Sequence, residues 1–406
     1  MQYRQFPKID NVSVSVLGFG CMRLPLLQKN KNLTPTEFTK TNEIDYEKSK
    51  ALFKLAYDNG INYFDTAWQY QGGKSKVVLG KALKELAIRD KVYVADKCPV
   101  WLIKDESDWD KYIDLQLKNL QTDHIDFYLL HALNAERWQI VQKFNGLKYL
   151  EKAKADGRIR HIGFSFHDNH EVFKQIIDGY DKWEFCQLMI NIIDTHADIK
   201  KGFNEAGLIN LEYAEKHGIG VIVMEPLRGG VLANPPEKVK SLFAESGIPR
   251  FASEWGLRWV LNHQNVICTL SGMNEEEHVL VNSASVSAAQ PNSLLDKELA
   301  ACKKVSEWYR QKMLVPCTGC GYCMPCPENV KIPAIFKEYN RLSMIGAFET
   351  SKDIPSDKKI YSATYKKLQL EENGADRCIQ CGKCEQVCPQ HIHIRDILKT
   401  VHSKLL

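Results

Sequence analysis

Short apolar segments recur along the first three quarters of the chain, and segments with helical spacing lie between them. Eight of the apolar segments are rich in β-branched and aromatic residues and are short enough to be buried strands. In the intervening segments, apolar positions return every three or four residues, and several segments close on glycine, as helices commonly do. The eight predicted strands are VSVSVLGFG, INYFDTAW, KVYVADKC, IDFYLLHA, IRHIGFSF, FCQLMIN, GVIVMEPL and VICTLSGM.

The alternation of strand and helix predicts a parallel (β/α)8 TIM barrel of the α/β class over residues 1–290. An open doubly wound sheet is the alternative, but the segment GFGCM lacks the Gly-x-Gly-x-x-Gly pattern typical of that fold. A hairpin of MQYRQFPK and VSVSVLG is expected to cap the bottom of the barrel. The stretch from Lys29 to Thr41 is expected to form a mobile loop on the face where barrel active sites lie, or else a solvated loop without function.

A second, smaller domain is predicted after the barrel. Residues 291–309 form a polar stretch followed by a linker helix, and the domain itself is expected to span residues 310–406. Within it, the segments IPAIFKEYNRLSMIGAF and SATYKKLQLEENGA have helical spacing. The sequence therefore predicts a small, mainly α-helical domain behind the barrel.

The charge balance argues against two classes of partner. The chain has 54 basic and 50 acidic residues among 406, and a net charge of +4 over this length indicates no nucleic-acid or membrane partner. The N-terminal segment MQYRQFPKID lacks the apolar core of a signal peptide, and no stretch approaches the ~20 apolar residues needed to span a bilayer. These features predict a soluble, cytoplasmic protein.

The cysteines indicate metal binding. Clustered cysteines in a reducing compartment more often bind metal than form disulfides, and eight of the thirteen lie in the runs CTGCGYCMPCP and CIQCGKCEQVCP. The other five are expected to be packing residues. These are Cys21, Cys98, Cys186, Cys268 and Cys302.

The second run has the C-x2-C-x2-C-x3-C-P spacing of bacterial ferredoxin sites, in which thiolates hold a [4Fe–4S] cluster. The first run has only two residues before its last cysteine. In two-cluster ferredoxins the fourth cysteine of each run binds the other cluster. Zinc bound by two sets of four cysteines is the alternative, because C-x2-C pairs also occur in zinc sites. The predicted cluster ligands are Cys317, Cys320, Cys323 and Cys388 for one cluster, and Cys378, Cys381, Cys384 and Cys326 for the other.

Four polar residues follow consecutive predicted strands of the barrel. Asp65 ends the second strand, with Tyr70 five residues later, Lys97 ends the third and His131 ends the fourth. The carboxyl ends of barrel strands meet at one face, so these side chains are expected to share the mouth. A lysine favours the ionised form of a nearby phenol, and a carboxylate holds the lysine charged. The alternative is a buried Asp–Lys ion pair with the other two residues lining a pore.

These four residues, followed in order by GFSFHD, CQLMIN, MEPLRGG and SGMNEEEHV, resemble the aldo-keto reductase superfamily over roughly residues 1 to 290. The resemblance implies that Tyr70 protonates a substrate carbonyl oxygen while a nicotinamide delivers hydride. It implies that Lys97 lowers the pKa of the tyrosine, that Asp65 pairs with the lysine, and that His131 orients the carbonyl.

The same resemblance implies a set of cofactor contacts. Ser165 and Gln187 match the residues that hydrogen-bond the nicotinamide carboxamide, and Asn282 matches the adenine contact. Met224 takes the place of the stacking tyrosine found in many members, and Gly272 belongs to the motif after the last strand.

The choice of cofactor stays open at this stage. The segment from Leu270 to Ala284, where many members bind the 2′-phosphate of NADP with basic residues, has no Lys or Arg and carries Glu275, Glu276 and Glu277. These carboxylates would repel a phosphate if they faced it, but they can equally complement the dipole of a helix. The weak stacking position leaves room for a flavin instead of NADP or NAD.

Taken whole, the chain resembles bacterial aldo-keto reductases that end in a two-cluster 4Fe-4S ferredoxin domain. The leading hypothesis is an oxidoreductase that uses NAD(P)H to reduce a small carbonyl substrate or oxidise an alcohol, with the clusters relaying electrons to or from a redox protein partner. Hydride carries two electrons and a cluster passes one, so a flavin-containing electron-transfer reductase is a second hypothesis. Clusters with a purely structural or redox-sensing role are a third.

Overall fold

The computed structural model describes residues 1–27, 43–198, 203, 207–348 and 360–405. The loop expected from Lys29 to Thr41 lies outside these ranges. Among the described helices, none combines the length and the apolar character needed to cross a membrane.

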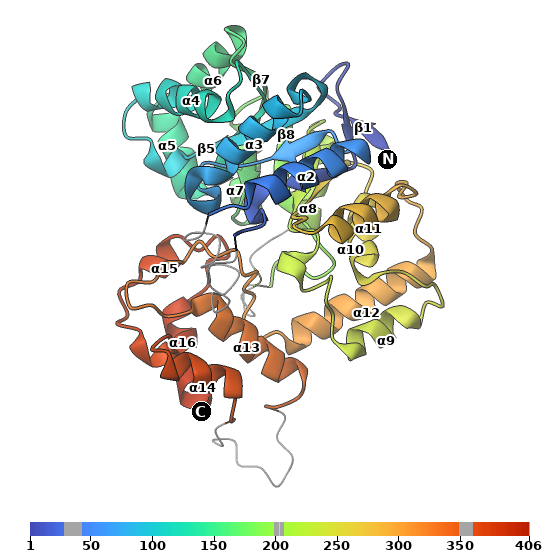
Figure 1. Cartoon of the computed structure of the whole chain (residues 1–406), viewed down its shortest axis with the longest axis vertical. Coiled ribbons are helices and arrows are strands. Elements are labelled where there is room, and N and C mark those ends of the chain that lie inside the picture. Colours follow the sequence, from blue (N-terminus) through green and yellow to red (C-terminus); the bar gives the residue numbers. More distant parts are fainter. Residues whose placement is uncertain (28–42, 199–202, 204–206, 349–359, 406) are drawn as a thin grey trace.

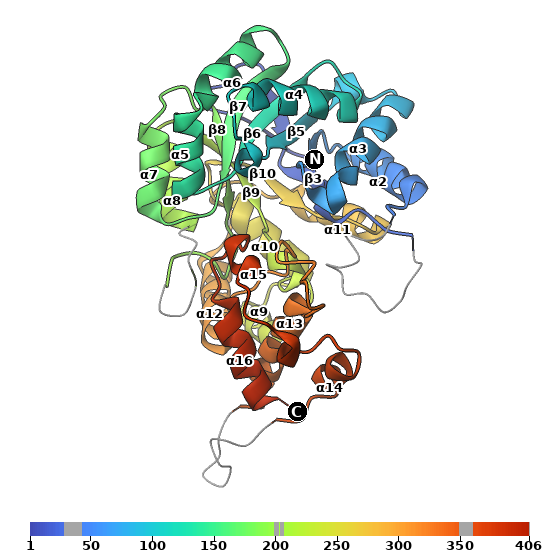
Figure 2. The same cartoon turned by 90° about the vertical axis from the view of Figure 1, so that its left-hand side faces the viewer.

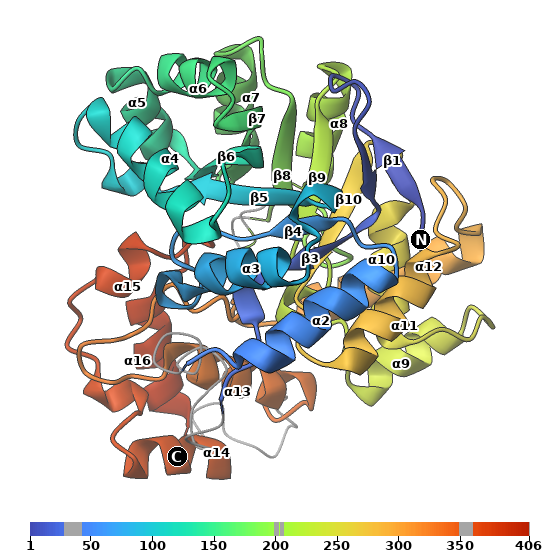
Figure 3. The same cartoon turned by 45° about the horizontal axis from the view of Figure 1, so that its top comes forward.

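Eight parallel strands close into a barrel in the order β10-β3-β4-β5-β6-β7-β8-β9. Every predicted strand contributes one of them, so the predicted barrel is confirmed and the open doubly wound sheet is wrong. Seen in Figure 3, helices surround the strands. The barrel strands are β3 Leu17–Gly20, β4 Tyr63–Asp65, β5 Tyr93–Cys98, β6 Ile125–Leu133, β7 Ile159–Phe166, β8 Phe185–Met189, β9 Gly220–Met224 and β10 Val266–Ser271.

An antiparallel hairpin of β1 (Tyr3–Gln5) and β2 (Ser13–Ser15) closes the end of the barrel where the strands begin. Behind it, aromatic rings fill the barrel interior: Phe6 lies 5.2 Å from Phe127, which lies 5.1 Å from Phe185. The first apolar run thus serves two strands, since β2 belongs to the hairpin and β3 to the barrel. The predicted hairpin is confirmed.

The barrel helices begin where polar side chains cap them. Asp45, Asn134 and Asn169 each accept a hydrogen bond from the backbone N–H three residues on, which satisfies a group that the helix itself leaves unpaired. The helices are α2 Tyr46–Asp58, α3 Lys74–Glu85, α4 Ser107–Leu120, α5 Ala135–Lys143, α6 Gly146–Ala155, α7 His170–Asp178, α8 Gly207–Lys216, α9 Glu237–Ala244, α10 Ala252–Leu261 and α11 Glu276–Val286. Short 3-10 turns lie at Cys21–Arg23, Tyr70–Gly73, Arg89–Lys91, Val100–Leu102 and Arg228–Gly230.

Helix α12 (Asp296–Lys312), predicted as a linker helix, packs on the barrel. Its buried side chains Cys302, Val305 and Tyr309 belong to the same apolar core as the barrel helices. Figure 1 shows it running beside α9 at the edge of the molecule. The helix therefore anchors the second domain to the barrel, and a domain boundary near residue 310 stays our proposal.

The C-terminal part is mainly helical and has its own apolar core, which includes Phe336, Tyr365, Leu398 and Val401. In Figures 1 and 2 this domain lies below the barrel, at the end opposite the hairpin. It therefore faces the carboxyl ends of the barrel strands. Its helices are α13 Ile332–Met344, α14 Ala363–Leu370, α15 Lys383–Gln386 and α16 Ile394–Lys404, with a 3-10 turn at Ala375–Arg377.

Candidate active site and cluster sites

The barrel brings together Asp65, Tyr70, Lys97 and His131, which we call the barrel tetrad. Lys97 Nζ lies 2.6 Å from Asp65 Oδ1 and 3.3 Å from the Tyr70 hydroxyl, and it donates to the carbonyl oxygen of Thr66 at 2.8 Å. Three of the residues stand on adjacent strands β4, β5 and β6, and Tyr70 begins the turn after β4. The predicted meeting of these side chains is present in the structure.

The environment of Tyr70 holds its phenol in the protonated form. Burial raises the pKa of Tyr70 well above its usual value, and the carboxylates of Asp65 and Glu225 raise it further. The lowering of this pKa by Lys97 that the family resemblance implied is therefore wrong for this structure, in which burial dominates and Asp65 pairs with the Lys97 ammonium group at 2.6 Å. The Tyr70 phenol is thus protonated at neutral pH.

His131 is electrically neutral in this setting. Burial lowers the pKa of His131 well below its usual value, and the cations of Lys97 and Arg137 lower it further. Its ring lies 6.2 Å from that of Tyr70 and 5.3 Å from that of Trp101, measured between centroids. Its buried Nδ1 atom has no hydrogen-bond partner among the described residues. A neutral imidazole can donate a hydrogen bond to a carbonyl oxygen without adding charge.

A cavity of about 530 Å³, which we call the barrel cavity, opens from the tetrad toward α11. It holds most of the predicted cofactor contacts on its walls. Ser165 does not line it: its buried Oγ accepts a hydrogen bond from the Ala132 N–H at 2.7 Å. Residues of the barrel cavity predicted from the sequence are Asp65, Tyr70, His131, Gln187, Met224, Gly272 and Asn282.

Two of the predicted contacts are already engaged. Gln187 Nε2 donates to Asp65 Oδ2 at 3.0 Å, and Asn282 Nδ2 donates to the Ser271 hydroxyl at 3.2 Å. At the α11 end of the cavity the wall is acidic, since Glu277 lines it, while Glu275 is drawn into a surface ion pair with Lys48 at 2.6 Å. The three glutamates therefore have different surroundings, and only Glu277 faces the barrel cavity.

Glu225, the residue after Met224, is a half-buried acid on the wall of the barrel cavity that was not singled out from the sequence. Its backbone has φ +53°, a strained conformation for a residue with a Cβ and one found often at functional sites. Its Oε1 accepts a hydrogen bond from the Thr318 hydroxyl at 3.2 Å, whereas its buried Oε2 has no partner among the described residues. Burial raises the pKa of Glu225, against the lowering effect of Arg23 and His167. An acid of this kind can hold a proton beside the cavity.

The loop after β9 also holds the C-terminal domain in place. Arg228, fully buried, pairs with Asp194 at 2.7 Å and donates to the carbonyl oxygens of Pro316 at 3.3 Å and Cys317 at 3.5 Å. The next residue, Gly229, has φ +63°, and a Cβ there would lie 2.2 Å from the Thr318 carbonyl oxygen. Glycine is required at this position because the two backbones touch.

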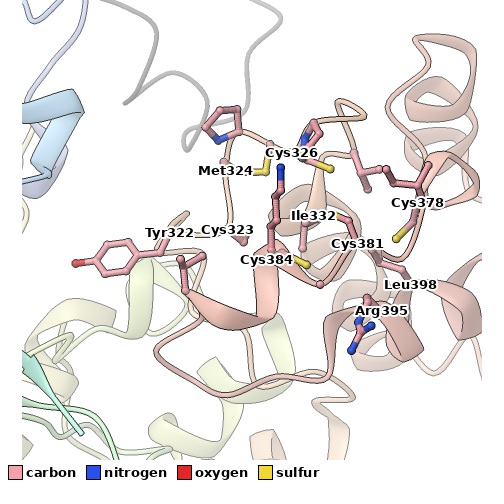
Figure 4. Close-up of a pocket in the computed structure, with 17 residues that line it drawn as sticks. Tyr322, Cys323, Met324, Cys326, Ile332, Cys378, Cys381, Cys384, Arg395 and Leu398 are labelled. Atoms are coloured by element: carbon pink, nitrogen blue, oxygen red, sulfur yellow. The ribbon is translucent and has the colours of Figure 1, made fainter. Parts of the chain in front are cut away.

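The eight clustered cysteines surround two cavities. We call the smaller one, which contains Cys317, the first cysteine cavity, and the larger one, which contains Cys378, the second cysteine cavity. Figure 4 shows cysteines around the second. Within the described part of the chain, no three His, Cys, Asp or Glu side chains lie close enough together to hold a single metal ion. The first cysteine cavity is lined by Cys317, Cys320, Cys323 and Cys388, and the second by Cys323, Cys326, Cys378, Cys381 and Cys384.

Without a metal, burial disfavours ionisation of these sulfurs. It raises the pKa of the Cys317 and Cys384 thiols to about 11, so binding of a metal would release their protons. The donor set therefore fits an iron–sulfur cluster, whose ligands are thiolates.

The five remaining cysteines are buried, as expected of packing residues. None of them lines the barrel cavity or either cysteine cavity. They are Cys21, Cys98, Cys186, Cys268 and Cys302.

Sequence comparisons agree with the two-part architecture. A model of the aldo/keto reductase family matches residues 17–307, and a model of the 4Fe-4S dicluster domain matches residues 316–392. Among curated relatives, L-galactose dehydrogenase of Arabidopsis thaliana is 27% identical over 63% of this chain and 83% of its own length. The NADH-specific methylglyoxal reductase of Escherichia coli (strain K12) is also 27% identical, over 60% of this chain and 85% of its own.

Solved structures share the barrel fold. An aldo-keto reductase from Klebsiella pneumoniae in complex with NADPH superimposes with a TM-score of 0.58 at 21% identity, covering 75% of this chain and 95% of that one. The holo form of an aldo-keto reductase from Bacillus halodurans gives 0.57 at 24% identity, covering 75% and 96%. The chain therefore belongs to the aldo/keto reductase family of oxidoreductases and carries a 4Fe-4S dicluster domain behind its barrel.

Proposed function

We propose that the protein is an NAD(P)H-dependent oxidoreductase that reduces a carbonyl group or oxidises an alcohol at the barrel tetrad, and that its two clusters relay electrons to or from a redox partner protein. One observation carries the proposal: the barrel cavity and the first cysteine cavity share a wall. Cys320 and Pro389 line both cavities, and Tyr70 lines the barrel cavity on the other side. Two redox sites that share a wall are close enough to act as a unit.

In the barrel, each tetrad residue has a distinct role. Asp65 keeps Lys97 charged, and Lys97 in turn holds the Tyr70 hydroxyl in place at 3.3 Å. Tyr70, protonated at neutral pH, gives its proton to the carbonyl oxygen of the substrate, and neutral His131 orients that oxygen by a hydrogen bond. The nicotinamide supplies hydride when bound.

The nicotinamide would be held along the barrel cavity. Gln187 and Met224 stand near the tetrad end, and Gly272 and Asn282 stand toward α11. Ser165 uses its oxygen as an acceptor for Ala132, which leaves its proton to be donated.

For the clusters, we propose that Cys388 crosses to the first run and Cys326 to the second. The support is that Cys388 lines the first cysteine cavity with Cys317, while Cys326 lines the second with Cys378. The second site is also the outer one, since Cys381 is exposed and the neighbouring side chains of Ile379 and Val387 are 61% and 44% exposed. The proposed path runs from the barrel cavity through the first cluster and the second cluster to the surface. In the reducing direction the partner would supply two single electrons, which with a proton convert NAD(P)+ to NAD(P)H before its hydride passes to the carbonyl, and alcohol oxidation would run the same steps in reverse.

The test of coupling is an anaerobic titration of cluster-loaded protein with NADH and then NADPH, followed by visible cluster absorbance. Bleaching by either nucleotide supports electron exchange between barrel and clusters. The denatured supernatant is examined for flavin, because a released flavin would favour the flavin-containing electron-transfer reductase instead. Carbonyl reduction with neither bleaching nor flavin would refute the relay and leave the clusters structural or redox-sensing.

The test of the barrel chemistry is Tyr70→Phe, which removes the proton donor but keeps the ring. A positioned general acid contributes roughly 10²- to 10⁴-fold to rate, so kcat for carbonyl reduction should fall by at least about 100-fold while NAD(P)H binding is retained. Tyr57→Phe on the outer helix α2 is the matched control and should leave kcat unchanged. Full turnover by Tyr70→Phe would overturn the assigned mechanism.

A further inference from the structure

One side chain of the C-terminal domain reaches into the barrel site. Tyr322 lies in the first cysteine run between Cys320 and Cys323, yet it lines the barrel cavity together with Tyr70 and His131. Figure 4 shows its side chain pointing away from the cysteines around the second cysteine cavity and toward the barrel. A residue of the cluster domain therefore forms part of the wall of the barrel site.

The Tyr322 hydroxyl lies within electrostatic range of the reacting groups. Glu225 and Arg137 are near enough to act on it electrostatically, and Tyr70 lines the same cavity. Arg137 is itself fixed, because it donates to the Ala132 carbonyl oxygen at 2.6 Å and stacks at 5.1 Å over the Trp101 ring that faces His131. The phenol therefore stands on the tetrad side of the barrel cavity.

The position of this wall is set by contacts on both sides of Tyr322. Before it, Arg228 binds the carbonyl oxygens of residues 316 and 317, and Thr318 bonds to Glu225. On the second run, buried Gln390 donates to Met189 Sδ at 3.7 Å, and His391 contacts the His167 carbonyl oxygen at 3.3 Å. Several buried contacts would have to break before the Tyr322 ring could leave the barrel mouth.

A substrate has to share the barrel cavity with the dinucleotide. The dinucleotide has to lie along the cavity between the tetrad and Asn282, so the substrate is confined to the end enclosed by Tyr70, His131 and Tyr322. A rigid aromatic wall limits the size of what can bind there, and its hydroxyl offers a hydrogen bond to a substrate oxygen.

We propose that Tyr322 is a specificity-determining residue that contacts the substrate, so that the cluster domain completes the barrel active site. The ring excludes bulky carbonyl compounds, and the hydroxyl donates a hydrogen bond to an oxygen next to the reacting carbonyl. The favoured class is compact aldehydes and ketones with a hydroxyl or a second carbonyl on the adjacent carbon. The inference rests on the proposed carbonyl chemistry of the same site.

The first test compares three aldehydes: glyceraldehyde, which is compact and carries the adjacent hydroxyl, butanal, which lacks it, and 4-nitrobenzaldehyde, which is bulky. Tyr322→Phe should lower kcat/KM for glyceraldehyde about tenfold, mainly through KM, and leave butanal unchanged, since a hydrogen-bonding site discriminates against partners that lack the group. Tyr322→Ala should raise kcat/KM for 4-nitrobenzaldehyde about tenfold or more. Tyr361→Ala, at a side chain 69% exposed in the same domain, is the matched control and should change none of these values.

Iron content and visible absorbance are measured for each variant, so that loss of a cluster is not mistaken for loss of a contact. Tyr322→Phe keeps the ring, and it serves as the decisive variant if Tyr322→Ala fails to load clusters. The same substrate profile in wild type and in a fully loaded Tyr322→Phe variant would overturn the inference.

The second test does not depend on turnover. With 3-fluorotyrosine at position 322 of the cluster-loaded protein, the fluorine resonance should shift when glyceraldehyde is added to the complex with NADH. A shift without any carbonyl reduction by the wild type would support the composite pocket and refute the proposed reaction. Turnover that depends on Tyr70, with no shift and no effect of position 322, would refute the pocket and leave the proposed reaction standing.

Discussion

Removing the Arg228 side chain should destabilise the loop after β9 and weaken the docking of the C-terminal domain on it. Arg228 is 0% exposed, and Asp194, its partner at 2.7 Å, is 2% exposed, so loss of the guanidinium leaves a buried carboxylate without its cation. Breaking such a pair from one side costs about 3 to 5 kcal/mol. Both partners belong to the barrel, so this cost falls on the loop after β9, and the bond that Asn191 still donates to Asp194 at 3.0 Å favours the lower end, about 3 kcal/mol. Docking itself loses the two hydrogen bonds from the guanidinium to the carbonyl oxygens of Pro316 and Cys317, about 1.5 kcal/mol each.

The assay is urea unfolding of cluster-loaded Arg228→Met under anaerobic conditions, followed by tryptophan fluorescence and by cluster absorbance. A two-domain protein is not expected to unfold in one step, so the two signals are analysed separately. Both signals should move to lower urea, the fluorescence signal because the ion pair lies within the barrel and the cluster signal because the C-terminal domain loses its hydrogen bonds to Arg228. Lys54→Ala, which removes a surface ion pair with Asp58 at 2.6 Å, should cost at most about 1 kcal/mol.

The double variant Arg228→Met with Asp194→Asn separates the cost of the unpaired carboxylate from the loss of the hydrogen bonds that Arg228 donates. With no charge left in the interior, it should be more stable than Arg228→Met alone, because the cost lies mainly in the unpaired carboxylate. If the double variant is no more stable than Arg228→Met, or if Arg228→Met behaves like Lys54→Ala, the unpaired Asp194 carboxylate is not the cause of the loss.

Three further outcomes follow from the site. Glu277→Arg replaces an acidic side chain on the cavity wall with a basic one, so it should tighten NADPH binding about tenfold and change NADH binding little. Equal Kd values for NADPH in the wild type and the variant would show that Glu277 does not face the 2′-phosphate. Cys388→Ser combined with Cys317→Ser should keep about half the iron, whereas Cys388→Ser combined with Cys381→Ser should lose nearly all of it, and the reverse pattern would disprove crossed ligation. The pKa of Tyr70 is raised above the ordinary tyrosine value of about 10, so its phenol stays protonated throughout the neutral and mildly alkaline range. We therefore expect kcat/KM for carbonyl reduction to be level from about pH 7 to pH 9. A fall in that range that disappears in Tyr70→Phe would contradict this ionisation state.

Local patterns were sufficient to predict the barrel and its tetrad. Each strand carries its own apolar run, and barrel closure places the carboxyl ends of neighbouring strands together, so Asp65, Lys97 and His131 could be expected to meet. The cysteine spacing was equally informative because a cluster imposes fixed distances between its ligands. The tetrad could be predicted because a regular fold brings its residues together, and the cysteine ligands could be predicted because they lie close together in the sequence.

The docking of the two domains could not be predicted in this way. The partners Arg228 and Pro316 are far apart in sequence, and no periodicity links them. Tyr322 looks like an ordinary residue between two ligands until the domain is placed over the barrel. At Ser165 the sequence motif matched the family, but the motif could not show that the Ser165 oxygen accepts a hydrogen bond from the Ala132 N–H.

The position of Cys388 has a consequence for how the protein is made. It lines the cavity next to the barrel with Cys317, but it follows all the other cysteines in the sequence, so under the proposed crossed ligation the first cluster would gain its fourth ligand only after both runs have been synthesised. Domains generally fold in the order in which they are translated, so the barrel would be complete by then. Crossed ligation would therefore make iron insertion a late step of maturation, and the barrel mouth would lack its wall from the cluster domain until that step.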